Sequence, residues 1–199
     1  THPFDRFIFM PSELVAGVEY SFNRLHDVTL GYDHDILQKV HIYSGYLQNE
    51  WRNSRWGFLV GARVDKHSLI SDPVISPRVN IRYNPDDNLN FRLSYSTGFR
   101  SPQAYDEDFH VAIVGGERVV TVLAAGLKEE SSRSVSASAD LYHRFGNVQT
   151  NLLVEGFYTD LRDVFALRQL EEPDAAGNAV LERYNGSGAR VAGVNVEAK

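Results

Sequence analysis

Alternation between apolar and polar residues is the feature that most restricts what this chain can fold into. Between Glu13 and Asn23, every even position from Leu14 to Phe22 is apolar, whereas most odd positions are polar or glycine. A two-residue period places alternate side chains on opposite faces of a β-strand, whereas a helix would scatter them around its circumference. The segment is therefore predicted to be a strand with one apolar face.

The same alternation returns along the rest of the chain. It is clear in residues 58–65, 79–83, 89–96, 134–141 and 148–158, and weaker in residues 39–52 and 189–198. In the run 148–158, Leu153 and Phe157 interrupt the polar side. Helical periodicity is not convincing in any segment. These runs predict an all-β chain with about eight strands of the length expected for tilted membrane-crossing strands.

The connections between the predicted strands alternate in length. Short turns rich in Asn, Asp, Gly and Pro are expected at residues 53–55, 84–88 and 146–147. Longer segments fall at residues 24–38, 67–76, 99–130 and 161–188. Outer-membrane barrels have short periplasmic turns at one end and long extracellular loops at the other, whereas a soluble β-sandwich has little reason for such alternation. We therefore predict an antiparallel up-and-down transmembrane β-barrel.

Two local features refine this fold. Aromatic residues beside the short turns indicate a girdle at a membrane interface, although aromatic residues near strand ends also occur in ordinary sheets. These residues are Trp51, Trp56, Tyr83 and Phe145. A hairpin built from residues 164–170, a turn at 173–178 and residues 180–184 is expected to extend the last strands above the membrane.

Composition excludes several classes of function. The mean hydropathy is −0.31 and no stretch approaches the roughly 20 apolar residues of a membrane helix. A barrel strand is compatible with this value because its apolar and polar residues cancel in the mean. The net charge of −6, without a basic run, argues against nucleic acid as a partner. The absence of cysteine excludes disulfides and thiolate metal sites.

Two separated segments resemble the barrel signature of TonB-dependent outer-membrane receptors. They are residues 93–104 (LSYSTGFRSPQA) and residues 127–131 (LKEES). In that family, a strand ending in Gly-Phe-Arg-x-Pro enters an extracellular loop, and Leu-Lys-x-Glu-x-Ser begins the returning strand. Further matches are residues 48–51 (QNEW), 61–65 (GARVD), 76–78 (SPR) and 193–197 (GVNVE), so the resemblance covers nearly the whole chain. Residues 106–110 and 115–117 look most like receptors of the Bacteroidetes group.

The resemblance implies a location, partners and an activity. Members of this family lie in the outer membrane of Gram-negative bacteria and have a 22-stranded barrel, a plug domain and a TonB box. Energy from the TonB system drives uptake of a ferric siderophore, cobalamin, haem or a glycan. Residues 1–199 would be one barrel segment without the plug and the remaining strands. We expect its partners to be outer-membrane lipid, its own plug, TonB and a small-molecule or metal-chelate ligand.

Two alternatives stay open at this stage. One is a smaller closed outer-membrane barrel with a structural or adhesion role, and the other is a secreted soluble β-sandwich. If the chain is an interior barrel fragment, its exposed strand edges are expected to cause self-association in isolation.

The long segment 99–130 holds the candidate ligand-binding residues. They are Arg100, Asp106, Glu107, Asp108 and His110. Arg100 is expected to anchor the base of this extracellular loop by pairing with one of the three acidic residues. The acidic spacing matches no calcium loop, and the His residues show no His-Glu-x-x-His pattern, so neither a metal site nor a cofactor is expected. No nucleophile-elbow motif occurs, so the chain is predicted not to be an enzyme.

A second set of candidate residues lies at the polar positions of the predicted strands, on the side opposite the apolar residues. These lumen-facing residues are Arg63, Asp65, Arg78, Arg82, Arg92, Glu155 and Glu197. They are expected either to contact the plug or line the ligand path, or simply to solvate a polar interior and pair with one another.

Overall fold

The computed structural model describes residues 1–29, 34–102, 119–173, 175, 177 and 179–199. The main sheet contains β1 (His2–Phe7), β2 (Met10–Thr29), β3 (His34–Arg52), β4 (Trp56–His67), β5 (Val74–Asp86), β6 (Leu89–Arg100), β8 (Glu130–Phe145), β9 (Val148–Arg162) and β12 (Ala189–Ala198). A small sheet contains β7 (Val119–Leu123), β10 (Phe165–Gln169) and β11 (Ala179–Asn185). The described residues include no helix long and apolar enough to cross a membrane.

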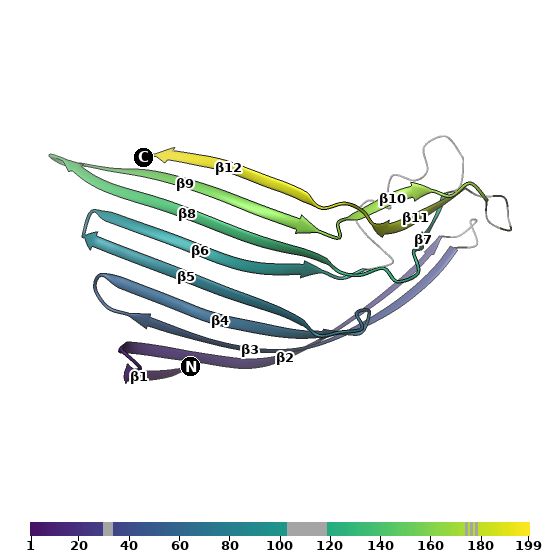
Figure 1. Ribbon diagram of the computed structural model, residues 1–199, viewed down its shortest axis with the longest axis horizontal. Helices are drawn as coiled ribbons and strands as arrows, with labels where there is room; N and C mark the ends of the chain where they lie inside the picture. Colours follow the sequence, from purple (N-terminus) through teal and green to yellow (C-terminus); the bar gives the residue numbers. More distant parts are fainter. Residues whose placement is uncertain (30–33, 103–118, 174, 176, 178) are drawn as a thin grey trace.

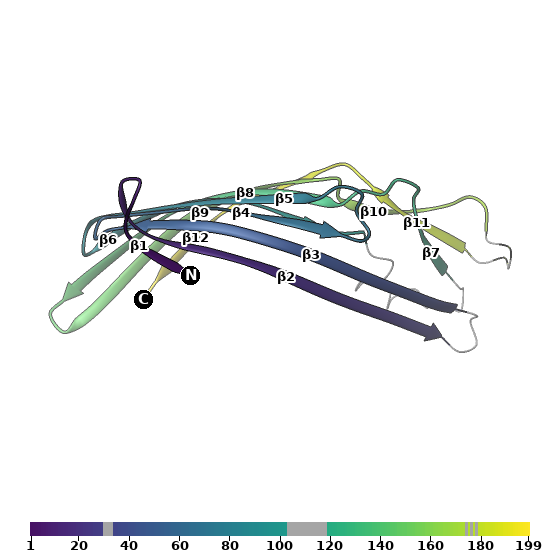
Figure 2. The same cartoon turned by 90° about the horizontal axis from the view of Figure 1, so that it is seen from below.

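The main sheet confirms the predicted up-and-down topology. Its nine strands lie in the order β1-β2-β3-β4-β5-β6-β8-β9-β12, and every neighbouring pair is antiparallel. Eight long strands correspond to the eight expected crossings, and the short β1 is an addition (Figure 1). The sheet is a single curved layer with β1 and β12 at its edges, so the β-sandwich alternative is wrong for the described residues (Figure 2).

Strand register gathers the apolar positions on one face of this sheet. Ile81 of β5 lies directly opposite Phe58 of β4 and Leu93 of β6. The same row continues through Ala137 and Gly156 to Val194 on β12. Directly opposite residues point to the same side of a sheet, so the apolar alternation predicted for separate strands combines into one continuous apolar face.

The apolar face is exposed, and the other face holds buried polar groups. Val18 is 91% exposed and Val194 is 70% exposed, whereas Asp65 on the polar face is only 4% exposed. Among the described residues, the buried hydrophobic side chains are Val40, Ile70 and Val180 alone. This distribution is the reverse of that in a water-soluble protein and suits a sheet whose outer side meets an apolar solvent.

Aromatic rings gather at the end of the sheet that carries the short turns. The Trp56 ring lies 4.2 Å from that of Tyr83 and 5.5 Å from that of Phe58, measured between centroids. Trp51 stacks on Phe9 at 5.6 Å. The predicted clustering beside the short turns is therefore present; its position at a membrane interface stays a prediction.

The longer connections differ from the expected ones. The predicted loop at residues 24–38 is wrong, because β2 and β3 stay paired as far as Thr29 and His34. The apolar alternation lapses at Arg24 and Lys39, but backbone hydrogen bonding does not require an apolar face and the ladder continues. β1 was also not expected from the sequence.

The hairpin after β9 is confirmed, with β10 and β11 paired antiparallel. β7, which lies in the predicted loop 99–130, pairs in parallel with β11 and was not expected.

Candidate functional site

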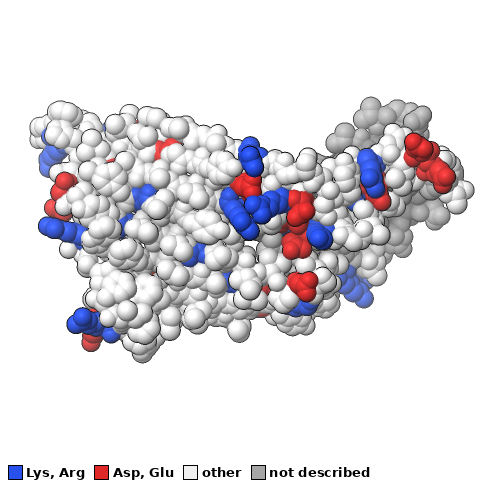
Figure 3. Space-filling view, viewed as in Figure 1, with Lys and Arg blue, Asp and Glu red and all other residues white. Residues whose placement is uncertain are grey.

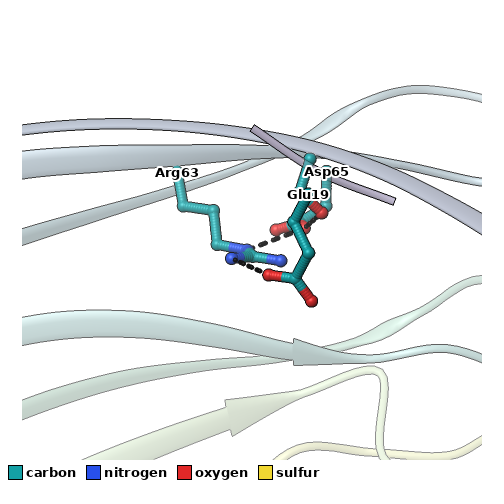
Figure 4. A network of polar contacts seen from close by, with 4 residues as sticks. Glu19, Arg63 and Asp65 are labelled. Atoms are coloured by element: carbon teal, nitrogen blue, oxygen red, sulfur yellow. Dashed lines mark hydrogen bonds and ion pairs between the residues drawn. The ribbon is translucent and has the colours of Figure 1, made fainter. Parts of the chain in front are cut away.

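The polar face carries a compact ion-pair network on β2, β3 and β4. Register places Glu19, Ser44 and Asp65 in one row across the three strands. Arg63 lies two residues before Asp65 on the same face. Its Nε donates to Oδ1 of Asp65 at 2.8 Å, and its Nη1 donates to Oε2 of Glu19 at 3.1 Å. Figure 4 shows the three charged side chains pointing toward one another on the concave side of the sheet.

Asp65 is the buried centre of this network. Its carboxylate also accepts a hydrogen bond from Ser44 Oγ. A buried carboxylate is stable only when ionic and hydrogen-bond partners replace its lost hydration, and Arg63 and Ser44 supply them. The arrangement therefore braces three neighbouring strands against one another. Both partners contact the same oxygen, Oδ1, so Asp65 is well suited to holding the wall together.

An arginine group lies further along the polar face. Arg82 of β5 and Arg92 of β6 are directly opposite each other, and Arg78 belongs to the same face. In the part of the chain that the structure describes, no ion pair involves any of the three. Two like charges placed directly opposite destabilise a sheet unless a counter-charge joins them. All three arginines line one hollow of about 420 Å³. This arginine group can attract carboxylates or another anion.

A second polar centre holds the small sheet to the ends of β6 and β8. Glu130 lies directly opposite Arg100 and pairs with it, Oε2 to Nη1, at 3.5 Å. The Glu130 Oε1 atom accepts the backbone N–H of Phe165, the first residue of β10. The Arg100 guanidinium lies 5.6 Å from the centroid of the Phe165 ring, and that of Arg183 lies 5.9 Å from it.

Asn185 adds a second attachment for the small sheet. Its Oδ1 accepts the backbone N–H of Lys128 at 2.8 Å. Its Nδ2 donates to the carbonyl oxygens of Lys128 at 3.1 Å and Asp163 at 2.7 Å. One side chain therefore joins the end of β11 to the segments that precede β8 and follow β9. Together with Glu130, it fixes the base of the long connections.

The structure places the predicted residues as follows. Register puts all seven candidate lumen-facing residues on the polar face, namely Arg63, Asp65, Arg78, Arg82, Arg92, Glu155 and Glu197. It brings Arg63 and Asp65 into contact, whereas Glu155 contacts Asn195 and Glu197 pairs with Lys199. Whether this face lines a lumen stays a prediction.

The acidic cluster expected to contact a ligand is not described. Asp106, Glu107, Asp108 and His110 lie outside the described residues, and so does their expected pairing with Arg100. Among the described residues no three His, Asp or Glu side chains are close enough together to hold a metal ion.

Sequence reasoning missed Glu19, Ser44 and Glu130. Glu19 and Ser44 belong to the polar phase of their strands, but only the register of β2, β3 and β4 shows that they meet Arg63 and Asp65. Glu130 is the acidic position of the Leu-Lys-x-Glu segment, and that match was the available signal. The two signature segments are in fact cross-strand neighbours, with Gly98 opposite Ser132 and Arg100 opposite Glu130.

Comparison with solved structures supports the same fold. The siderophore receptor PirA from Pseudomonas aeruginosa is similar with a TM-score of 0.78 and 17% identity, covering 98% of this chain and 37% of that one. The FrpB iron transporter from Neisseria meningitidis (F3-3 variant) is similar with a TM-score of 0.65 and 16% identity, covering 94% and 30%. The copper transporter OprC gives 0.63 and 14%, covering 94% and 32%. The chain therefore spans about a third of the length of these proteins.

A comparison with curated proteins finds no match. The family described as "TonB dependent receptor-like, beta-barrel" matches residues 6–199. This family and the similar structures are receptors and transporters, which confirms the prediction that the chain is not an enzyme. The likeness to Bacteroidetes receptors stays a prediction. The match over residues 6–199 and the open, antiparallel sheet together establish that the chain belongs to the TonB-dependent receptor β-barrel family.

Proposed function

We propose that this chain forms part of the wall of an outer-membrane receptor that imports a scarce solute with energy from TonB. The observation that carries the proposal is the continuous exposed apolar face opposite a polar face with buried charges. On β4 the apolar positions begin at Trp56 and give way to Lys66. This distance, at about 3.3 Å per residue and a tilt near 40°, spans about 25 Å, which equals the apolar band of an outer-membrane barrel.

The polar face would then line the lumen and meet the plug domain of the full-length protein. The arginine group of Arg78, Arg82 and Arg92 forms no ion pair among the described residues, and Glu50 is the one carboxylate among the residues that line its hollow. The excess of positive charge favours an acidic segment of the plug or an anionic solute in transit. In the ion-pair network, Arg63 contacts both Asp65 and Glu19, so the role of the network would be to stiffen the wall.

The connections at the opposite end from the short turns would be extracellular. The alternation of short and long connections supports this orientation, because a strand that leaves a short periplasmic turn reaches the outer surface at its other end. Residues 99–130 and 161–188 would capture the ligand there, with Arg100, Asp106, Glu107, Asp108 and His110 as candidate contacts. Similar proteins named for siderophores, iron and copper favour a metal chelate over a glycan.

Uptake by the full-length receptor in its own host tests this proposal. The probes are radio-iron-loaded catecholate and hydroxamate siderophores, haem and cobalamin, each with and without an intact TonB system. We expect one probe to accumulate only when both receptor and TonB are present. Deletion of residues 115–118, which precede β7, should weaken binding of that probe and leave barrel assembly intact, because it removes no residue of a described strand. Accumulation of every probe at the same rate without the receptor would contradict the proposal.

A further inference from the structure

The apolar face ends in a group of charged residues on β8, β9 and β12. Register places Arg133, Asp160 and Arg190 side by side on these three strands. Arg162 lies two residues beyond Asp160 and points to the same side. Figure 3 shows charged side chains gathered on this face near the ends of β9 and β12, whereas most of the surface over the strands is uncharged. The three arginines are called the rim cluster below.

The rim cluster and its neighbour Asp160 together carry three positive charges and one negative charge. Asp160 accepts hydrogen bonds from Arg162 Nε at 2.9 Å and from Arg190 Nε at 3.3 Å. Arg133 is exposed and forms no ion pair with the described part of the chain. The side chains of Arg162 and Arg190 are 53% and 77% exposed. Arg162 and Arg190 thus share one carboxylate, and together with Arg133 the three arginines carry more positive charge than Asp160 compensates on the outward side.

A shallow apolar hollow lies on the same face below the rim cluster. Its volume is about 460 Å³, and its lining includes Leu93, Ala137, Ala139, Val154 and Gly156. Small side chains at Ala137, Ala139 and Gly156 form the depression between larger neighbours. Ala137 lies four residues along β8 from Arg133, or about 13 Å at 3.3 Å per residue. A positively charged site and an apolar hollow are therefore aligned along one strand.

We propose that this surface binds a phosphorylated lipid of the surrounding leaflet, with its phosphate on the rim cluster and an acyl chain in the hollow. Guanidinium groups bind phosphate oxygens through paired, charge-assisted hydrogen bonds. Arginines that face outward at the edge of an apolar band lie at the depth of lipid head groups, where anionic lipid is the nearest counter-charge. The proposal rests on the membrane position proposed above and adds a defined site on its outer wall.

Native mass spectrometry of the full-length receptor in detergent tests the phosphate site. The probes are an acylated, bisphosphorylated glucosamine disaccharide, its dephosphorylated form and inorganic phosphate. Arg133→Gln and Arg190→Gln should each weaken binding of the phosphorylated lipid about fivefold, which corresponds to about 1 kcal/mol per basic residue near a membrane surface. Arg52→Gln is the control, because the Arg52 side chain has a similar exposure (62%) but lies beside the short turn that follows β3, away from the rim cluster. The dephosphorylated lipid should bind weakly to every variant.

A second substitution tests the hollow without changing any charge. Ala137→Phe should fill the hollow and weaken the phosphorylated lipid several-fold, whereas Val18→Phe, on the same face but outside the hollow, should leave binding unchanged. If inorganic phosphate alone binds tightly, the ligand of the site is a free anion and not a lipid, and the proposal is overturned. Equal lipid binding by the wild type and both arginine variants would also overturn it. If the receptor assembles in membranes but gives one of these two results, the lipid site is ruled out. The proposed transport function is not affected by that outcome.

Discussion

Asp65 shows how single residues stabilise this wall. Its carboxylate is nearly inaccessible to solvent and is held by Arg63 and Ser44, each on the same face of the sheet. The polar phase of β4 was predicted from alternation, and the pairing of Arg63 with Asp65 is a short-range contact within one strand. The contribution of Glu19 depends on the register of three strands, which alternation does not specify.

Removing Arg63 should leave the Asp65 carboxylate buried with too few partners. Arg63→Ala is therefore expected to lower the free energy of unfolding of the full-length receptor by about 1–3 kcal/mol. Arg63 is itself partly exposed, so the effect should stay below that of a fully buried ion pair. The measurement is urea unfolding in lipid vesicles. The double variant Arg63→Ala/Asp65→Asn should recover part of the loss, and additive effects of the two changes would contradict direct coupling.

Gly61 is a site where a side chain cannot be added without moving the backbone. A Cβ atom there would lie 2.6 Å from Cβ of Gln48 and 3.1 Å from the carbonyl oxygen of Leu47. Gly61→Ala should therefore destabilise the receptor by about 1–3 kcal/mol. Gly45→Ala, on the neighbouring strand, is the control because nothing lies within 4 Å of its added methyl group. Equal unfolding midpoints for the two variants would show that the close approach has no energetic effect.

At the scale of elements, alternation predicted the long strands and their faces well. Each apolar run became part of one face because side chains in a strand alternate strictly. Leu153 and Phe157, which interrupt the pattern of β9, lie on the polar face opposite Glu197 and Gly193. The Phe157 ring occupies the space where a Gly193 side chain would be, since an added Cβ would lie 2.7 Å from its Cζ atom.

The small sheet was only partly predictable. The hairpin of β10 and β11 is local and carries turn residues, so its sequence indicates it. The parallel pairing of β11 with β7 joins residues far apart in the chain, and its short strands have no distinctive alternation. The extension of β2 and β3 was missed because polar residues there no longer mark an apolar face.

Glu130 should control how firmly the small sheet is attached. Glu130→Ala removes one ion-pair partner of Arg100 and the acceptor of the Phe165 N–H, so attachment of the small sheet should weaken by about 1–3 kcal/mol. Hydrogen exchange should become faster in β10 and β11 and remain unchanged in β8 and β9. Glu129→Ala is the control at the adjacent acidic position. Unchanged protection of the Phe165 amide would contradict the anchoring role.

At the scale of the whole molecule, the open edges of the sheet have a direct consequence. β1 and β12 each pair with one neighbour and expose unpaired backbone groups on the other side. Together with the exposed apolar face, these edges should make the isolated piece of 199 residues self-associate in detergent micelles. Sedimentation velocity should show concentration-dependent oligomers for the isolated piece. A stable monomer at every concentration would contradict this prediction, because it would show that the edges of β1 and β12 do not pair with other copies.

We predict that the exposed apolar face of the sheet meets lipid and that the opposite face meets water. These 199 residues contain no cysteine, so single spin labels can be attached at Leu93→Cys and Ser94→Cys in a full-length receptor whose remaining cysteines, if any, are replaced. The label at residue 93, in the row with Ile81 and Ala137, should collide frequently with oxygen dissolved in the bilayer. The label at residue 94 should instead respond to a water-soluble nickel chelate, or to neither reagent where the plug covers it. Equal oxygen accessibility at the two adjacent positions would contradict the account.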